Sequence, residues 1–511
     1  MRSIFVISDL HLGGIYPPPG TRGFRLCTHA DAIARFVQER TEAMKTNGRS
    51  EIVLNGDTVD FLAERNSPAA GGAADEPVTW SAFTADPQAA LAKFEAIVDR
   101  DKCVFDAFGR FLAAGGRLTV LLGNHDVELS LPLVRDALRR TLGVKREHDF
   151  EFIHDGEAYV IGDALIEHGN RYDSWNQIDM DALRRIRSLT SRHQPVPAQY
   201  QFDPPAGSRL VASVMNKIKE TYSFIDLLKP ENSAAVPILL ALEPQYRRRL
   251  GEIAQLWYWT RSHGLEGPAL PKFGGDIKAK DDPTRPFGHN VRATVPGVGS
   301  AQILLGALDP NEALKGAIAD ALGTKEAQEF LRDIDDHLPS GGPGLAGSNV
   351  GAKETWETAK GIWGLLAGSE SAASEQRLRA LLRAIRGLQK EDAFDTGKEP
   401  LPEYLDAARE LSKGGFRYVV FGHTHQAKSI EFESGRWYFN SGTWADVLRF
   451  PFEILKLPET DALPKLRDFV MDMKSGDFSR WTLFRPTYVR LDLADDGRLA
   501  KAQLCTVPTA P

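Results

Sequence analysis

The stretch 117-RLTVLLGNHDVEL-129 passes abruptly from an apolar run to a polar cluster. Its first half has the continuous apolar pattern that predicts a strand buried on both faces. The polar cluster at 123–126 stands where this strand would end. Taken alone, the cluster leaves three roles open for His125: metal ligand, proton donor or part of a turn. The same succession of an apolar run and a polar cluster recurs along the chain, and this recurrence predicts both the fold and the site.

The first part of the chain alternates strand patterns with helical patterns. Strands are expected from Ile4 to Ser8, at 51–57 and at 117–124, and helical periodicity lies at 31–46 and roughly 86–114. This βαβαβ order predicts a largely parallel sheet with helices on its faces. Ligands of such sheets bind at the carboxyl ends of the strands.

Further strand patterns follow in two separate parts of the chain. A hairpin is expected at 149–162, with its turn at Asp155-Gly156, and another strand at 164–170. The sheet pattern then stops, resumes at 416–425 and continues to the end of the run 487–499.

The domain organisation follows from this interruption. Between the two groups of strands the sequence is mostly helical, with Pro/Gly-rich breaks. We therefore expect an α/β fold with its elements in layers. Residues 1–175 and 414–511 would form one catalytic domain, and 176–413 a mostly helical insertion that caps it.

Composition excludes several classes of protein. The chain has 511 residues, above the usual size of one domain, and a net charge of −7, which gives no overall attraction to nucleic acid. Its three cysteines are widely spaced, which argues against a disulfide framework or a thiolate metal site. The N-terminus lacks the pattern of a secretory signal, and the most apolar stretch elsewhere, 234–242, is too short to span a bilayer. We expect a cytoplasmic protein without a transmembrane segment.

The polar clusters at the strand ends share one chemistry. They consist of carboxylates, imidazoles and one amide: Asp9, His11, Asp57, Asp60, Asn124, His125, Asp126, His168, His423 and His425. Oxygen and imidazole ligands without thiolate suit Mn²⁺, Fe²⁺/Fe³⁺ or Zn²⁺. Two such ions about 3.5–4 Å apart need a bridging group, and a carboxylate at the end of a central strand, such as Asp57, can bridge.

In these clusters the chain resembles the calcineurin-like metallophosphoesterases. That family has five ordered motifs, and all five are present: 9-DLH-11, 56-GDTVD-60, 123-GNHD-126, His168 in 167-EHGN-170, and 422-GHTH-425. The similarity covers roughly 1–172 and 414–500. It implies a sandwich of β-sheets flanked by helices and an enzyme that uses two metal ions to hydrolyse phosphate esters.

The resemblance also implies a role for each residue. Asp9, His11, Asp57 and His425 would hold the first ion, and Asp57, Asn124, His168 and His423 the second. His125 would not be a ligand but the acid that protonates the leaving group, steadied by the neighbouring Asp126.

Two further expectations come from the residues themselves. Asp60 is expected to be structural, orienting a ligand. Asn170 and Arg171 follow His168 and are expected near the substrate phosphate, although a surface salt bridge is an equal alternative for Arg171.

The chemistry of phosphate ester hydrolysis fits this division of roles. It requires charge neutralisation on the phosphate, a hydroxide at neutral pH and a proton for the leaving alkoxide. Two divalent ions would supply the first two, with Mn²⁺ favoured, and an imidazolium at His125 the third. Whether the ester is a phosphomonoester or a phosphodiester stays open.

Several alternatives for the function remain. One is a DNA nuclease of the repair-exonuclease type, against which the acidic composition argues. Others are a pyrophosphatase of nucleotide-linked lipid precursors, a protein phosphatase, and a catalytically silent interaction scaffold, which would usually have lost ligands. Residues 181–261 carry twelve Lys/Arg against seven Asp/Glu, so the insertion would suit a polyanionic or phospholipid-like substrate, or would simply be a solvated helix face.

Overall fold

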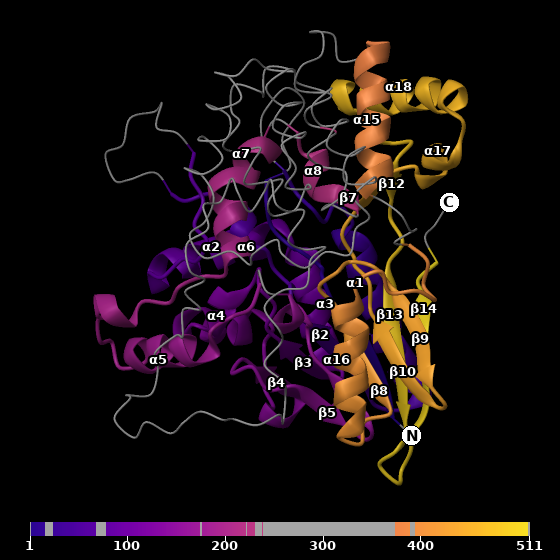
Figure 1. Cartoon of the computed structure of the whole chain (residues 1–511). Helices are drawn as coiled ribbons and strands as arrows, with labels where there is room; N and C mark the ends of the chain where they lie inside the picture. The colour runs from indigo at the N-terminus through magenta and orange to yellow at the C-terminus, as the bar shows by residue number, and fades with distance from the viewer. Residues whose placement is uncertain are drawn as a thin grey trace, which may run out of the picture. The chain divides into compact units, whose positions relative to one another are not determined.

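A computed structural model describes residues 2–15, 24–67, 78–173, 176–220, 222–229, 238, 374–388 and 394–508 (Figure 1). The protein is of the mixed α/β type, with mixed sheets. It divides into two compact units: unit 1 comprises Met1–Ser223, Ala393–Asp446 and Phe484–Pro511, and unit 2 comprises Phe224–Asp392 and Val447–Leu483. The expected boundaries of an insertion at 176–413 stay a prediction, and much of that segment, including 247-RRR-249, lies outside the described residues.

A six-stranded sheet in unit 1 has the order β14-β13-β1-β2-β3-β4. Its strands are β1 (Arg2–Ile7), β2 (Ser50–Asn55), β3 (Arg117–Leu121), β4 (Phe150–Ile153), β13 (Thr487–Leu493) and β14 (Leu499–Thr506). β1, β2, β3 and β4 are parallel to their neighbours, with Val6 opposite Val53 and Val53 opposite Thr119. The parallel sheet predicted from the βαβαβ order is thus present, and the antiparallel pair β13 and β14 extends it beside β1.

A second, five-stranded sheet has the order β5-β6-β8-β10-β9. It contains β5 (Tyr159–Ile161), β6 (Ala164–Ile166), β8 (Tyr418–Phe421), β9 (Lys428–Glu433) and β10 (Arg436–Asn440). β6, β8 and β10 are parallel, and the edge strands β5 and β9 are antiparallel to them.

The prediction of a hairpin at 149–162 is wrong. β4 pairs with β3 in the first sheet and β5 pairs with β6 in the second, so the two strands are not partners. The turn is present, with Gly156 at a φ of 90°, but it carries the chain from one sheet to the other. Strand patterning marks which residues are buried and does not identify the pairing strand.

The two sheets contribute to one hydrophobic core. Its buried side chains come from both sheets: Ile4, Val6, Val53, Leu121, Val489, Leu491 and Leu499 from the first, and Tyr159, Ile161, Ala164, Ile166, Tyr418, Val420 and Phe439 from the second. Because strand side chains alternate between faces, the other residues of β1, β2 and β3 point to the opposite face of the first sheet.

Helices cover that opposite face (Figure 1). They are α1 (Ala30–Asn47), α2 (Pro87–Arg100), α3 (Lys102–Ala113) and α4 (Pro132–Thr141). Their phenylalanines, among them Phe36, Phe94 and Phe108, pack against Phe5 and Ile52 of the sheet. The helical region expected at 86–114 is therefore two helices.

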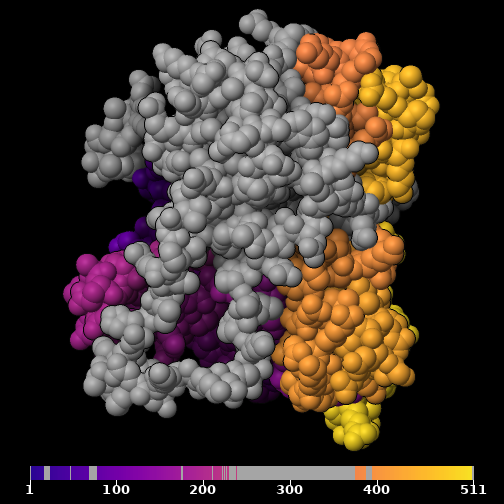
Figure 2. Space-filling model, in the orientation of Figure 1, coloured from indigo at the N-terminus to yellow at the C-terminus, as the bar shows by residue number. Residues whose placement is uncertain are grey.

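Helix α16 (Pro402–Lys413) packs on the second sheet, where the Tyr404 ring lies 6.4 Å from that of Phe421. The outward-facing residues of α16 and β9 form part of the molecular surface drawn in Figure 2. Unit 1 further contains α5 (Met180–Thr190), α6 (Ala206–Leu210), a π-helical turn (Val211–Met215) and α7 (Asn216–Lys219). Its short 3₁₀ turns are Phe61–Ala63, Val127–Ser130, Glu147–Asp149, Asn170–Tyr172 and Ala198–Tyr200.

The described part of unit 2 is a small sheet with helices. The sheet has the order β12-β11-β7, with strands β7 (Leu228–Lys229), β11 (Val447–Arg449) and β12 (Thr482–Leu483). The helices are α8 (Phe224–Leu227), α15 (Glu375–Leu388), α17 (Phe452–Lys456) and α18 (Glu459–Ser475). Among the described residues of the whole chain, no helix combines the length and apolar character needed to cross a bilayer.

Candidate metal centre

The polar clusters predicted from the sequence follow the carboxyl ends of five strands. Asp9 and His11 follow β1, Asp57 and Asp60 follow β2, 124–126 follows β3, His168 follows β6, and His423 and His425 follow β8. Hydrogen bonds join the two sheets at this edge. The His423 backbone N–H donates to Asp9 Oδ2 over 3.0 Å, and the Asn55 amide donates to the Glu167 carbonyl over 2.9 Å.

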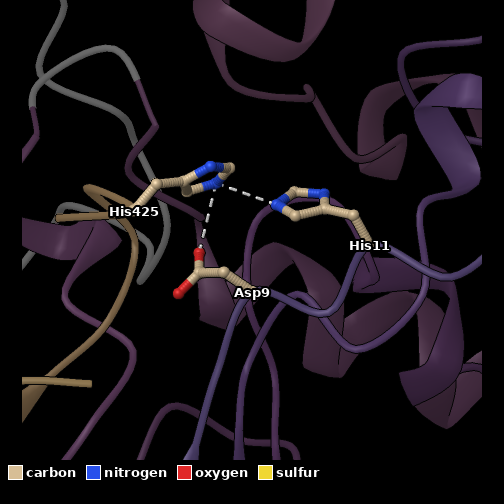
Figure 3. Close-up of side chains that lie close together, drawn as sticks. All are labelled: Asp9, His11 and His425. Atoms are coloured by element: carbon tan, nitrogen blue, oxygen red, sulfur yellow. Dashed lines mark hydrogen bonds and ion pairs between the residues drawn. The ribbon is translucent and has the colours of Figure 1, made fainter. Parts of the chain in front are cut away.

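One group of candidate ligands consists of Asp9, His11 and His425 (Figure 3). His425 Nε2 lies 2.9 Å from His11 Nε2 and 3.5 Å from Asp9 Oδ1. Their three ligand atoms lie within 4.8 Å of one another, close enough for a single cation to contact all three. These are three of the four residues that the family resemblance assigns to the first ion, the fourth being Asp57.

A second group consists of Asp57, His168 and His423. His168 Nε2 lies 3.2 Å from Asp57 Oδ2, and the same oxygen lies 3.8 Å from His11 Nε2. Asp57 also forms a third group with His11 and His125. Its carboxylate therefore lies beside candidate ligands of both ions, as a bridging carboxylate requires.

The backbone is strained at these residues. Six described non-glycine residues have a positive φ, and five of them are candidate ligands: Asp9 (54°), His11 (46°), Asp57 (49°), His423 (69°) and His425 (61°), the sixth being His193. This region of φ is uncommon for residues with a side chain, and such strain concentrates at functional sites. The left-handed backbone conformation at these residues directs the side chains at the strand ends toward one another.

Three glycines of the motifs leave room for this packing. A Cβ on Gly56 would overlap the His168 ring, one on Gly123 would overlap the Asp57 carboxylate, and one on Gly422 would lie 2.8 Å from Asp9 Oδ2. The Gly residues of GD, GN and GH are thus required by close approach, because a side chain would displace a candidate ligand or, at Gly422, Ser8 as well as Asp9.

The donor atoms fit a divalent cation. Asn124 Oδ1 is buried and has no hydrogen bond partner among the described residues, although buried polar atoms are nearly always bonded. Asp9 Oδ1 and His168 Nε2 are also buried, and within the described part of the chain they have no hydrogen-bond partner beyond the ion-pair contacts given above. Carboxylate, imidazole and amide oxygen converging in this way match the ligands of Mn²⁺, Fe or Zn²⁺.

The second nitrogen of three rings is held by the protein. His11 Nδ1 lies 3.3 Å from Asp60 Oδ2, His168 Nδ1 lies 2.7 Å from the Asn55 carbonyl oxygen, and His423 Nε2 lies 3.1 Å from Asp173 Oδ2. Histidines that ligate metals commonly have such support, which fixes the ring and its tautomer. Sequence reasoning missed Asp173, since no motif marks it.

Electrostatic interactions favour charged histidines in the ion-free site. Burial lowers the pKa of His168, yet the Asp57 and Asp9 carboxylates raise it to about 10. Burial likewise opposes protonation of His125, but Asp60 and Asp57 raise its pKa to about 9. Against its own burial, these histidines hold the pKa of Asp57 well below its usual value. The carboxylates that would hold a cation thus also stabilise positive charge on His168.

Asp60 and not Asp126 supports the His125 ring. His125 Nδ1 lies 3.0 Å from Asp60 Oδ1. Both oxygens of Asp126 accept backbone hydrogen bonds instead, from Gly123 N–H over 2.7 Å and from Thr58 N–H over 2.8 Å. The expectation that Asp126 steadies His125 is therefore corrected: Asp126 stabilises the turn, and Asp60 contacts both His125 and His11.

The structure gives Asn170 and Arg171 partners within the protein. The Asn170 amide donates to the Asn176 carbonyl over 2.8 Å. Arg171 Nε lies 3.1 Å from Glu167 Oε2, and its guanidinium donates to the Gly156 carbonyl over 2.5 Å. These contacts correspond to the structural alternative for Arg171, and a contact with substrate phosphate stays a prediction.

Comparison with known proteins gives no relative: no family model, no curated protein and no solved structure matches this chain. Function is therefore inferred from the motifs and from the geometry of the site.

Proposed function

We propose that this protein is a metal-dependent hydrolase of phosphate esters, of the calcineurin-like metallophosphoesterase type. The observation that carries the proposal is the position of Asp57, whose Oδ2 lies within 3.8 Å of His11 in one group of candidate ligands and 3.2 Å of His168 in the other. Two sheets with a common core and helices on their outer faces support the same proposal.

The residues that would hold the ions are those of the two groups together with Asn124. Asp9, His11, Asp57 and His425 would hold one ion, and Asp57, Asn124, His168 and His423 the other. When bound, two divalent ions, with Mn²⁺ favoured over Fe and Zn²⁺, would neutralise phosphate charge and acidify a water molecule toward a pKa of about 7.

His125 is the group suited to protonate the leaving oxygen. Its Nδ1 faces Asp60, so Nε2 is the nitrogen from which a proton would pass to substrate. Asp60 and Asp57 keep the ring charged, and its side chain is 17% exposed, while those of His11 and His168 are 1% exposed. A charged imidazole that substrate can reach is what an alkoxide leaving group requires.

The assay that tests this proposal uses a mono-aryl and a bis-aryl phosphate with Mn²⁺, before and after treatment with a chelator. Hydrolysis of one or both, lost with chelator and restored by Mn²⁺, is expected, and the preferred substrate distinguishes monoesterase from diesterase. Plasmid DNA and nucleotide-lipid pyrophosphates then separate the nuclease from the pyrophosphatase alternative. Hydrolysis of none of these substrates, by protein that also binds no metal, would leave the interaction scaffold as the better description.

A further inference from the structure

The loop that follows His168 contacts a second candidate ligand of the same ion. Asp173 Oδ2 lies 3.1 Å from His423 Nε2, and each side chain is only 9% exposed. His168 and His423 themselves have ring centroids 5.3 Å apart. One short segment of chain thus supplies one ligand and contacts another.

Asp173 is itself held in place by the loop. The Asn176 side-chain amide donates to Asp173 Oδ2 over 2.7 Å, and the Asn176 backbone N–H donates to the Asp173 carbonyl over 3.0 Å. The Asn170 amide closes the loop by donating to the Asn176 carbonyl. The carboxylate is therefore oriented toward His423 by its own segment.

This contact determines which nitrogen of His423 is available to a cation. A neutral imidazole has one N–H and one lone pair, and a carboxylate can only accept a hydrogen bond. With Nε2–H donating to Asp173, the lone pair lies on Nδ1. His168 has the opposite arrangement, since its Nδ1 lies against the Asn55 carbonyl and its Nε2 lies next to Asp57.

We infer that Asp173 is a positioning residue for the second ion: it fixes the orientation and tautomer of His423, and so sets the affinity of the subsite formed by Asp57, Asn124, His168 and His423. The inference rests on the proposed function, because it requires that this subsite binds a metal. Loss of a carboxylate that supports a metal-bound histidine typically weakens metal affinity by roughly 10- to 100-fold.

The test is an equilibrium titration of the metal-free protein with Mn²⁺. The wild type is expected to bind two ions. Asp173→Asn should weaken one of them by about tenfold or more and leave the other unchanged, and Asp173→Ala, which also removes the acceptor, should weaken it further. Electron paramagnetic resonance gives a second readout, since Mn²⁺ bound to the variant should give the spectrum of an isolated ion where the wild type gives that of a coupled pair.

The matched control is Asp179→Asn, because Asp179 lies close by in the sequence but caps α5 by accepting from Ala182 N–H. It should leave both metal affinities unchanged. Unfolding of each variant in chelator shows whether the fold is intact. If Asp173→Asn does not fold, Asn176→Ala, which removes one hydrogen bond to the carboxylate, should give a smaller loss at the same subsite.

The outcomes separate the two proposals. Two wild-type ions with unchanged affinities in the folded Asp173 variants would contradict the role of Asp173 and leave the metal site in place. Equal weakening of both ions, with lower stability in chelator, would show that Asp173 is only structural. A wild-type protein that binds no metal would refute the proposed function, and the inference with it.

Discussion

Asp60 Oδ1 lies 3.0 Å from Nδ1 of His125. The other oxygen of the same carboxylate lies 3.3 Å from Nδ1 of His11. One side chain thus supports both the candidate acid and a candidate ligand of the first ion. Against the burial of Asp60, the charged His125 holds the pKa of this carboxyl far below its usual value. Asp60 is therefore an anion that keeps His125 protonated.

The roles of His125 and Asp60 predict a dependence on the leaving group. His125→Asn should retain metal and lose roughly 10²- to 10⁴-fold in rate on alkyl phosphate esters, with a much smaller loss on activated aryl esters, which leave without a proton. Asp60→Asn should likewise lower the rate on alkyl esters more than the rate on aryl esters. It should also lower the affinity for the first ion, because His11 loses its support. The kcat values on the paired substrates and the metal content measure both effects.

Asp126→Asn serves as the control for these two variants. Its carboxylate holds two backbone N–H groups, so the change should lower the free energy of unfolding by about 1–3 kcal/mol and leave the ratio of alkyl to aryl rates unchanged. Loss of metal in His125→Asn, or an equal loss of rate on both esters, would show that His125 is not the acid.

A glycine prediction tests the close packing at Asp57. Gly123→Ala should displace the Asp57 carboxylate, because the added Cβ would overlap it, and metal binding should fall at both subsites. Gly397→Ala is the matched control, since neither glycine has a positive φ and the nearest atom to a Cβ at Gly397 is 3.4 Å away. Calorimetric titration with Mn²⁺ should separate the two variants, and unchanged binding in Gly123→Ala would contradict the bridging position of Asp57.

Metal binding should depend on pH through His168. The pKa of this ring is raised to about 10 in the ion-free site, so at pH 7 it carries a proton that a cation must displace. Apparent affinity should therefore rise with pH, by up to about tenfold per unit for each proton displaced, until the pH passes the pKa. Calorimetry in buffers of different ionisation enthalpy counts the released protons. Binding that neither releases protons nor depends on pH between about 6 and 8 would be inconsistent with ligation by His168.

A pH effect on stability is expected from Glu128, which is not one of the candidate ligands. Burial raises the pKa of Glu128 to about 7, although its Oε1 accepts a hydrogen bond from Thr84 N–H over 2.7 Å. Because the folded pKa exceeds the unfolded value of 4.5, the folded state binds more protons between these values, and stability falls as pH rises through 7.

Glu128→Gln should remove this dependence. The variant keeps an acceptor for Thr84 N–H but has no group that titrates at this position. The free energy of unfolding of the variant, relative to that of the wild type, should therefore rise between about pH 5 and pH 8 by roughly 3 kcal/mol at most. Denaturant unfolding in chelator at both pH values measures the gain. Glu157→Gln, at an exposed side chain, is the control, and its stability should fall between the two pH values nearly as much as that of the wild type. If Glu128→Gln also loses as much stability as the wild type between pH 5 and pH 8, the prediction is contradicted.

Local patterns were sufficient to predict the parallel strands β1, β2 and β3 and the polar clusters that follow them, because both are properties of contiguous sequence. Local patterns did not predict features that depend on contacts between distant parts of the chain. The partners of β4 and β5 are strands in different sheets, and strand patterning does not specify a partner.

The support of His125 shows the same limit. Adjacency in sequence favoured Asp126, whereas the contact is made by Asp60, 65 residues away, because the turns after the neighbouring strands β2 and β3 bring the two side chains together. Asp173 likewise meets His423 across 250 residues, and nothing near it in the sequence indicates this.

The most direct test of the central claim is the number of divalent ions bound by the wild type and by Asp57→Asn, measured by native mass spectrometry after Mn²⁺ loading. The wild type should bind two ions. Asp57→Asn should bind fewer at the same Mn²⁺ concentration, because Asp57 lies between both groups of ligands and the amide removes a negative charge that both would use. A wild type that binds no ion, or an Asp57→Asn protein that binds as many ions as the wild type with the same affinity, would contradict the proposed dinuclear centre.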